Sequence, residues 1–386
     1  MNKIKKNVLP ICAAIVLALC LAFSASGCAA LPSGEEFSGE VTAKSWVDKC
    51  YDKIVYIDKN LSDRDCIGGP EFNASQKYII DTAKAAGYTD VTKQEISFNA
   101  YVKKDADTSA AAEFTWDGKF YKRQGRKYVE AEEAEATHIK GEVKTHNVVV
   151  KVKGKSEEQI IVGAHYDGDG SGDNGSGIAL ALTMLENLAG EETPYSLVFV
   201  FFTAEEYGCY GSTAYADAMS DEEVANTKYM INMDSLICGD YCYLYGGVQD
   251  DDTQTVNMTE AYDNAMNLAK SLGLNFRSNP WTYENPAPGY DTPDYASPST
   301  GDWSDHVGFK ERGIQYVYFE ATNWEIPGPY EEYDGYGETY LVGMLMNTEN
   351  DYLEFIEKYF PGRPQQHLSQ FFPLLRALLI QPKLPF

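Results

Sequence analysis

The clearest pattern along the chain is an alternation of short apolar runs with amphipathic segments between residues 147 and 320. The runs at 147–152, 159–165, 196–203, 228–233 and 313–320 have the length and the β-branched or aromatic content of strands. Apolar residues recur at helical spacing in 73–88, 178–188 and 259–272. Because strands that alternate with helices are typical of α/β domains, the pattern predicts one three-layer αβα sandwich with a mostly parallel central sheet.

The segments around this alternation complete the predicted domain, which spans residues 46–386. Residues 196–203 (Ser-Leu-Val-Phe-Val-Phe-Phe-Thr) are apolar on both faces, as expected for a central strand between two helix layers. A further strand is expected at 91–98, and the polar, weakly patterned stretch at about 103–137 is too short for an inserted domain, so it predicts a hairpin excursion. The leucine- and phenylalanine-rich segment 362–386 predicts a terminal helix that packs on the domain.

The first residues have the pattern of an export signal. Lys3, Lys5 and Lys6 precede an apolar run from about residue 8 to 23, which ends in small residues before Cys28. This arrangement resembles a bacterial lipoprotein signal and predicts a signal peptide at 1–27 and a lipidated Cys28 with a tether at 28–45. Ordinary signal cleavage near the same point, giving a secreted protein, is the alternative. Both readings place the protein outside the cytoplasm, with membrane contact only through a lipid on Cys28.

Export would place the cysteines in an oxidising environment, where they can form disulfides. Cys50 and Cys66, and Cys238 and Cys242, are possible disulfide pairs in an oxidising location. Cys209 follows an apolar strand and is expected to be a small buried side chain.

Composition narrows the function classes. The chain has 58 acidic and 32 basic residues, a net charge of −26, which argues against a general nucleic-acid binder because such proteins need a basic surface. Hydrophobic residues at 44% and aromatic residues at 13% can form a core, which excludes a disordered acidic chain. Most of the carboxylates are expected to be solvated surface groups.

A small group of acids and histidines stands at the ends of the predicted strands. His165 and Asp167 close one strand, Glu205 and Glu206 follow the most apolar strand, and Asp234 follows a third. In open α/β sheets, ligands bind outside the carboxyl ends of the strands, so these side chains are expected to meet at one edge.

Two further candidates can reach the same edge. Asp173 lies between the first of these strands and its helix, and His306 lies in the loop before the strand at 313–320. Imidazole and carboxylate groups suit zinc, and a set that shares one carboxylate suits two metal ions about 3.5–4 Å apart. The sequence therefore predicts a zinc site at the carboxyl ends of the strands.

Competing motifs fit less well. The acids and glycines at 167–173 match the opening of an EF-hand calcium loop, but the twelfth position, which should be a bidentate Glu, is Ile178. No Lys-Ser/Thr pair follows the glycines as in a phosphate-binding loop, and no Gly-x-Ser-x-Gly nucleophile elbow occurs.

Five ordered motifs resemble a known family, the co-catalytic dizinc aminopeptidases of the bacterial leucyl aminopeptidase and aminopeptidase Y type. The motifs are His165-Tyr166-Asp167, Asp173-Asn174-Gly175-Ser176-Gly177, Ala204-Glu205-Glu206-Tyr207-Gly208, Asn232-Met233-Asp234 and Ser304-Asp305-His306. The resemblance covers roughly residues 73–378, with glutaminyl cyclases as wider relatives.

The resemblance implies a role for each site residue. The zinc ligands would be His165, Asp173, Glu206, Asp234 and His306, and Asp173 would bridge two zinc ions. Glu205 would be the general base, and Asp167 the carboxylate that orients His165. Asp173 follows His165 by only eight residues, a shorter loop than many relatives carry, so Asp169 remains a second candidate for the bridging position.

The implied activity is removal of N-terminal residues from peptide substrates. Zinc ions make a bound water acidic near neutral pH, and Glu205 is expected to accept its proton and return it to the leaving amine. The alternatives are a glutaminyl-peptide cyclotransferase, a carboxypeptidase or dipeptidase on the same scaffold, and a binding lipoprotein without activity. The oligomeric state does not follow from the sequence.

The remaining candidates are weaker. His138, His146 and His367 are expected to be ordinary surface or packing residues. The Tyr- and Pro-rich stretch at 281–297, with Tyr283 and Tyr290, is either a pocket rim or an ordinary surface loop.

Overall fold

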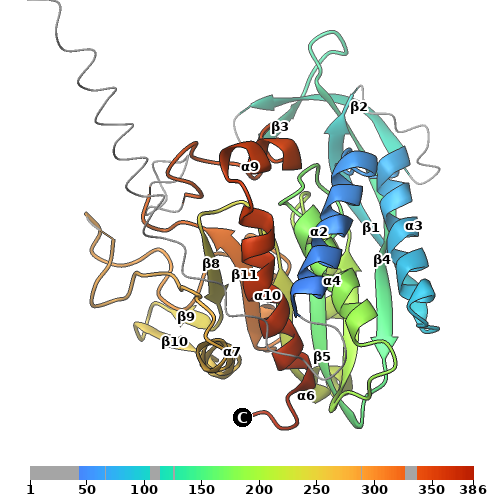
Figure 1. Cartoon of the computed structure of the whole chain (residues 1–386). Helices are drawn as coiled ribbons and strands as arrows, with labels where there is room; N and C mark the ends of the chain where they lie inside the picture. The colour runs from blue at the N-terminus through green and yellow to red at the C-terminus, as the bar shows by residue number, and fades with distance from the viewer. Residues whose placement is uncertain (1–42, 66, 105–113, 125–126, 288, 327–336) are drawn as a thin grey trace, which may run out of the picture. The chain divides into compact units, whose positions relative to one another are not determined.

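A computed structural model describes residues 43–386, apart from residues 66, 105–113, 125–126, 288 and 327–336 (Figure 1). The chain divides into residues 1–44 and a compact unit, Ser45–Phe386, which contains the fold. The predicted signal peptide, Cys28 and most of the predicted tether lie outside the described residues. Within the described part of the chain, no helix has the length and apolar character needed to cross a membrane.

A nine-stranded sheet forms the middle of the compact unit. Along the path β3-β2-β4-β6-β5-β7-β11-β8, the four strands β6, β5, β7 and β11 are parallel, and antiparallel strands extend the sheet on both sides, with β1 paired to β4. The strands are β1 (Val91–Lys103), β2 (Phe114–Gln124), β3 (Lys127–Glu130), β4 (His138–Val152), β5 (Ser156–His165), β6 (Tyr195–Phe202), β7 (Thr227–Met233), β8 (Tyr241–Tyr245) and β11 (Tyr316–Thr322). A separate two-stranded ribbon contains β9 (Val248–Asp250) and β10 (Thr255–Asn257).

Helices cover both faces of the sheet and give the three layers that the sequence predicts. One face carries α2 (Ala43–Asn60), α3 (Pro70–Ala85), α4 (Gly175–Asn187), α7 (Glu260–Ser271), α9 (Leu353–Tyr359) and α10 (Arg363–Ile380). The other face carries α5 (Tyr210–Ala218), α6 (Asp221–Asn226) and α8 (His306–Glu311). Figure 1 shows α2, α4 and α10 side by side over the first face.

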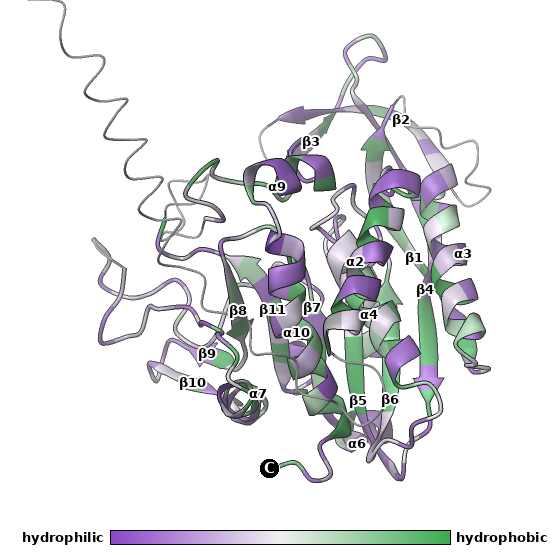
Figure 2. Ribbon diagram, viewed as in Figure 1, coloured by the Kyte–Doolittle hydropathy of each residue, from purple (hydrophilic) through white to green (hydrophobic). Residues whose placement is uncertain are grey.

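The core follows from strands that are apolar on both sides. In β6, Leu197, Phe199 and Phe201 face the α4 and α10 layer, and Val198 and Val200 face the other layer. Figure 2 shows β5 and β6 as largely hydrophobic strands in the middle of the compact unit. Burial on both faces is typical of parallel strands between helices. Because the strands are held from both sides, the positions of their ends are fixed as well.

One boundary differs from the sequence-based expectation, and two expected elements are present. Helix α2 begins at Ala43, where a tether was predicted to continue to residue 45, and its core residues Cys50, Ile54 and Ile57 are fully buried. At 114–130, β2 and β3 pair as an antiparallel hairpin that also joins β4. The terminal segment forms α10, which packs against α4 and α7.

The possible disulfide between Cys238 and Cys242 is wrong. Both residues are free buried thiols, because Cys242 points into the core from β8 while Cys238 Sγ faces Asp351 Oδ2 at 3.7 Å. Cys50 and Cys209 are also free and buried, and Cys66, the other possible partner of Cys50, lies outside the described residues.

Candidate metal centre

The ends of β5 and β7 bring a histidine and two aspartates together. His165 is the last residue of β5, Asp234 follows β7, and Asp173 lies in the loop before α4. His165 Nε2 is 3.1 Å from Asp173 Oδ1 and 3.3 Å from Asp234 Oδ1. One ligand atom from each of these three buried residues fits within 4.8 Å of the others, so they form a ready set of donors for one cation.

Glu205 and Glu206 reach the same place through the turn after β6. Ala204 has a left-handed backbone, with φ at 58°, which reverses the chain so that both neighbouring carboxylates face the cavity. Glu205 Oε2 lies 3.9 Å from His165 Nε2. Glu206 Oε1 packs against Gly168, where an added Cβ would lie 2.6 Å from that oxygen.

Asp167 ties this turn to His165. Its two carboxylate oxygens accept the backbone N–H groups of Glu205 and Glu206, each at 3.2 Å. His165 Nδ1 lies 3.2 Å from the main-chain oxygen of Asp167 and 3.7 Å from its carboxylate. The residue expected to orient His165 by its carboxylate thus holds the ring with its carbonyl, while its carboxylate fixes the glutamate turn.

His306 approaches from the start of α8. Its ring stacks near Tyr318 and tilts against Tyr316, with centroids 5.1 and 4.5 Å away. The side chain is fully buried, and neither ring nitrogen has a hydrogen-bond partner among the described residues. Ser304 in the same loop donates to Asp234 Oδ2 at 2.6 Å and so links the loop to the first group.

The glycine-rich loop that carries Asp173 is clamped from the far end of the chain. Asp351 is buried, and its carboxylate accepts the N–H groups of Gly172 at 2.8 Å and Asp173 at 2.9 Å. A Cβ at Gly170 or Gly172 would lie 2.1 Å from Asp351 Oδ2 or Cys238 Sγ, respectively. The alternating glycines therefore allow a carboxylate to approach the loop backbone closely.

Residues in α2 and just after it also hold the loop that carries Asp173. The guanidinium of Arg64, fully buried, donates to the carbonyl oxygen of Gly170 at 2.7 Å. Asp58 in α2 accepts the hydroxyl of Ser171 at 2.5 Å and the N–H of Leu353 at 2.8 Å. Residues from both ends of the compact unit thus fix the loop between β5 and α4.

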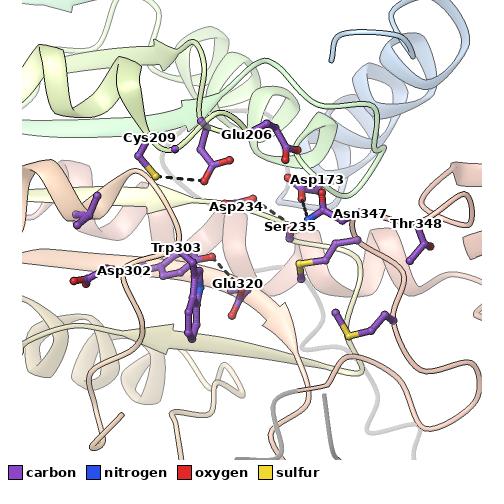
Figure 3. A pocket seen from close by; sticks show the side chains of 16 residues that line it. Asp173, Glu206, Cys209, Asp234, Ser235, Asp302, Trp303, Glu320, Asn347 and Thr348 are labelled. Carbon is purple, nitrogen blue, oxygen red and sulfur yellow. Dashed lines mark hydrogen bonds between the residues drawn. The ribbon is translucent and has the colours of Figure 1, made fainter. Parts of the chain in front are cut away.

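A cavity of about 570 Å³ opens over the site (Figure 3). Its walls include Trp303, Met344, Met346 and Glu320 in addition to the acids described above. Asn347, which also has a left-handed backbone with φ at 58°, donates from Nδ2 to Asp173 Oδ2 at 3.3 Å. Left-handed residues other than glycine are uncommon and occur often at active sites, which fits their presence here.

The residues present fit zinc. His165 lies with Asp173 and Asp234 in one group of potential ligands, and Glu205 and Glu206 line the same cavity as the two aspartates. Such nitrogen and oxygen donors are those that zinc takes in catalytic sites. The buried ring nitrogens of His306 without protein partners are consistent with a metal ligand.

A protein-family model agrees with this geometry. Residues 147–340, half of the chain, match the model for peptidase family M28. The chain belongs to peptidase family M28. It is therefore a metallopeptidase, as the resemblance of its motifs predicts.

Two curated relatives show how far the likeness extends. The chain is 28% identical over 256 residues to the alkaline phosphatase isozyme conversion protein of Escherichia coli K12, a match that covers 60% of this chain and 69% of that protein. It is 32% identical over 120 residues to leucine aminopeptidase 2 of Trichophyton equinum, which covers 30% of this chain. The chain spans only 24% of the length of that fungal enzyme.

Solved structures share the fold of this M28 peptidase. The zinc aminopeptidase of Bacillus subtilis superimposes with a TM-score of 0.57 at 17% identity and covers 87% of this chain and 96% of its own. The glutaminyl cyclase of Tannerella forsythia superimposes with a TM-score of 0.52 at 13% identity, covering 87% and 99%. The α/β fold with a central sheet is therefore confirmed, and it is common to both enzyme classes.

The electrostatics of the peptidase site follow from buried acids around one histidine. Burial is the largest single influence and lowers the pKa of His165, but the surrounding carboxylates, Asp234 and Glu205 first and then Asp167 and Asp173, together raise it well above its usual value. Burial is also the main reason why the pKa of Glu205 lies well above the usual value of a glutamate. A site with this density of negative charge favours a divalent cation.

The structure shows where the other candidate residues from the sequence lie relative to the site. Asp169 accepts the N–H of Asp65 at 3.2 Å and lines a different cavity, so Asp173 is the residue placed beside His165. Tyr283 is half-buried and donates to Asp251, and neither Tyr283 nor Tyr290 lines the cavity over the site. His367 is buried and packs near Leu236, whereas His138 lines the second cavity.

Sequence reasoning missed Asp351, Asn347, Arg64 and Asp58. Each lies outside the five motifs, in a segment without strong periodicity or in a helix that was not predicted. The alternating glycines at 168–172 were the available signal, since glycine marks places where backbone and side chain approach closely.

Proposed function

We propose that this M28 peptidase is an exported zinc aminopeptidase that removes N-terminal residues from peptides. The observation that carries the proposal is the meeting of His165, Asp173 and Asp234 within 4.8 Å beside Glu205. Leucine aminopeptidase 2 and the Bacillus subtilis aminopeptidase support the choice of substrate end.

We propose that the site holds two zinc ions. His165, Asp173 and Asp234, which lie within 4.8 Å of one another, would hold one ion. Glu206 and His306 would be the further ligands of a second ion that shares Asp173 with the first. Bound zinc supplies Lewis acidity toward a carbonyl oxygen and lowers the pKa of a bound water.

The protein's own residues would move the proton. Glu205, which lines the cavity, would accept a proton from the attacking water and return it to the leaving amine. Asp167 would keep Glu205 in place through its backbone N–H, and Asn347 would limit the movement of Asp173.

Glu205→Gln tests the proton transfer. The variant should keep close to two zinc per chain by metal analysis of the full chain purified in detergent. Its kcat on a peptide with a free N-terminus should fall at least about 100-fold, because general acid–base catalysis contributes about that much. Glu222→Gln, an exposed glutamate in α6, is the matched control. A fully active Glu205→Gln enzyme would remove Glu205 from this role.

One assay tests the reaction class. Peptides with free and with acetylated N-termini, including one that begins with glutamine, are scored for released residues and for pyroglutamate. We expect release from free N-termini only. Pyroglutamate formation without release would favour the cyclase seen among the structural neighbours, and cleavage of acetylated peptides alone would exclude an aminopeptidase.

Export and anchoring rest on the first 28 residues. The full chain expressed in a bacterium should fractionate with the membrane and be exposed outside the cytoplasm, and Cys28→Ser should release it. Retention of the unmodified chain in the cytoplasm would contradict the proposal.

A further inference from the structure

A second cavity, here called the hairpin cleft, adjoins the site on the side of the β2–β3 hairpin. It has a volume of about 720 Å³ and is bordered by the end of β1, the hairpin, the segment between α2 and α3, and the turn after β6. Glu206 lines both this cleft and the cavity over the site. A chain bound at Glu206 could therefore extend into both cavities.

The cleft follows the edge of a strand. Residues 99–103 of β1 all line it, although the side chains of Ala100 and Val102 are buried and those of Asn99 and Lys103 are exposed. Since successive side chains point to opposite faces of a sheet, a cavity that touches five in a row runs along the strand edge. In the part of the chain that the structure describes, β1 pairs with β4 only.

Aromatic rings stack on side chains of β1 beside the cleft. Tyr101 and Tyr128 stack with ring centroids 4.2 Å apart, and Tyr210 stacks on Phe98 at 4.3 Å. Tyr207, Tyr210 and Tyr128 line the cleft. Tyrosines present a large rigid surface that accepts many side chains.

The charged residues that line the hairpin cleft have both signs. Asp63, Asp65 and Asp169 line the cleft together with Lys103 and Arg123, and Lys103 Nζ lies 3.9 Å from Asp65 Oδ2. Recognition would thus depend on the peptide backbone and on aromatic contacts rather than on net charge.

We infer that the hairpin cleft binds the part of a peptide substrate that follows the scissile bond, as an extended strand along residues 99–103 of β1. This inference rests on the proposed aminopeptidase function. The first residue would occupy the cavity with Trp303 and Met346, and the chain beyond Glu206 would add to the sheet edge, a common mode of peptide recognition. The preferred substrates are then peptides of about four residues or more, because five edge residues span about 13 Å.

The family match does not account for this cleft. Its lining residues on β1, β2, β3 and the start of β4 all precede residue 147, where the match begins. The hairpin therefore lies outside the segment that matches the family model.

A length series tests the inference on the unmodified full chain. Dipeptide, tripeptide and pentapeptide amides share one first residue and have neutral residues after it. We expect kcat/KM to rise at least tenfold from dipeptide to pentapeptide, and to fall again by a similar factor when the third or fourth residue of the pentapeptide is N-methylated. Equal kcat/KM for all lengths, or no effect of N-methylation, would overturn the inference.

Variants locate the effect in the cleft. The ratio of kcat/KM for pentapeptide over dipeptide should fall about tenfold in Tyr101→Ala, and should stay as in the unmodified enzyme in Trp116→Ala, which changes an exposed aromatic residue of the same hairpin outside the cleft. An unchanged ratio in Tyr101→Ala would show that long peptides do not bind in the hairpin cleft. If no peptide of any length is cleaved, the aminopeptidase function fails instead, which is a different result.

Discussion

At the scale of single residues, the site depends on hydrogen bonds that hold the ligand loop from behind. Asp351 accepts two successive amides of the Gly172–Asp173 segment, so both of its oxygens act together. Groups of this kind keep a ligand in place although they do not touch the metal. Asp173 can share its carboxylate between two partners only while its backbone is fixed.

Asp351→Asn should therefore weaken metal binding. The amide keeps one acceptor, and its NH₂ group would face one of the two N–H donors, so the loop loses part of its support. We expect the zinc affinity, measured by competition with a chelator, to fall about 10–100-fold. Glu349→Gln changes an exposed acid two residues away and should leave the affinity as it is. Equal affinities for both variants would show that the loop holds its shape without Asp351.

His367 links protonation to stability. Burial, with a contribution from Arg363, lowers the pKa of His367 to about 3, whereas the unfolded chain should have the ordinary value of about 6.5. Below pH 6.5 the unfolded state gains a proton that the folded state does not, so stability is lost as the pH falls from about 6.5 toward 3. At pH 5 this single group should cost about 2 kcal/mol.

His367→Gln isolates that contribution. Glutamine does not titrate and can still donate to the carbonyl oxygen of Leu236. The loss in free energy of unfolding between pH 7.5 and pH 5, from urea titrations, should be about 2 kcal/mol smaller in the variant than in the unmodified protein. The same pH dependence in both proteins would assign the acid sensitivity to other groups.

At the scale of elements, the periodicity of the sequence predicted the strands of the core but not the segments that shape the site. The central strands β5, β6 and β7 were predictable because they are apolar on both faces, and their ends located the acids at once. Helix α2 was missed because its apolar residues are interleaved with lysines and aspartates. The segment 337–351, which supplies Asn347 and Asp351, has long-range contacts but no periodicity, so a pattern search cannot find it.

The terminal helix α10 is a core element. Phe371 is fully buried against Phe276 and Phe319, and Phe372 stacks on Trp46 of α2 at 6.3 Å. Phe371→Ala should lower the free energy of unfolding by about 3–5 kcal/mol, the usual cost of such a cavity. Gln366→Ala, at an exposed position of the same helix, should change it by less than about 0.5 kcal/mol. Similar urea midpoints for the two variants would show that α10 is only loosely attached.

At the scale of the whole molecule, the acidic residues that give the net charge of −26 lie in two different environments. Most carboxylates lie at the surface, where water and salt screen them. Those around His165 are buried together, and their mutual repulsion is a cost that bound cations would remove.

Metal removal should therefore lower the thermal stability. A ligand that binds only the folded state at about 100 times its Kd adds about 2.7 kcal/mol, so a chelator should reduce Tm by at least about 4 °C and added zinc should restore it. In Asp173→Asn the chelator should have a much smaller effect, because the shared ligand is lost. A Tm that does not respond to the chelator would mean that the site holds no stabilising cation.

The clamp on the ligand loop also has a consequence for the time at which activity begins. Asp58 and Arg64 precede the loop by more than 100 residues and Asp351 follows it by more than 170 residues, yet all three support the same few loop atoms. A nascent chain that already contains every motif from His165 to His306 still lacks one side of that support. The loop would gain its full support only after Asp351 has been synthesised, so the order of folding would delay activity until that point.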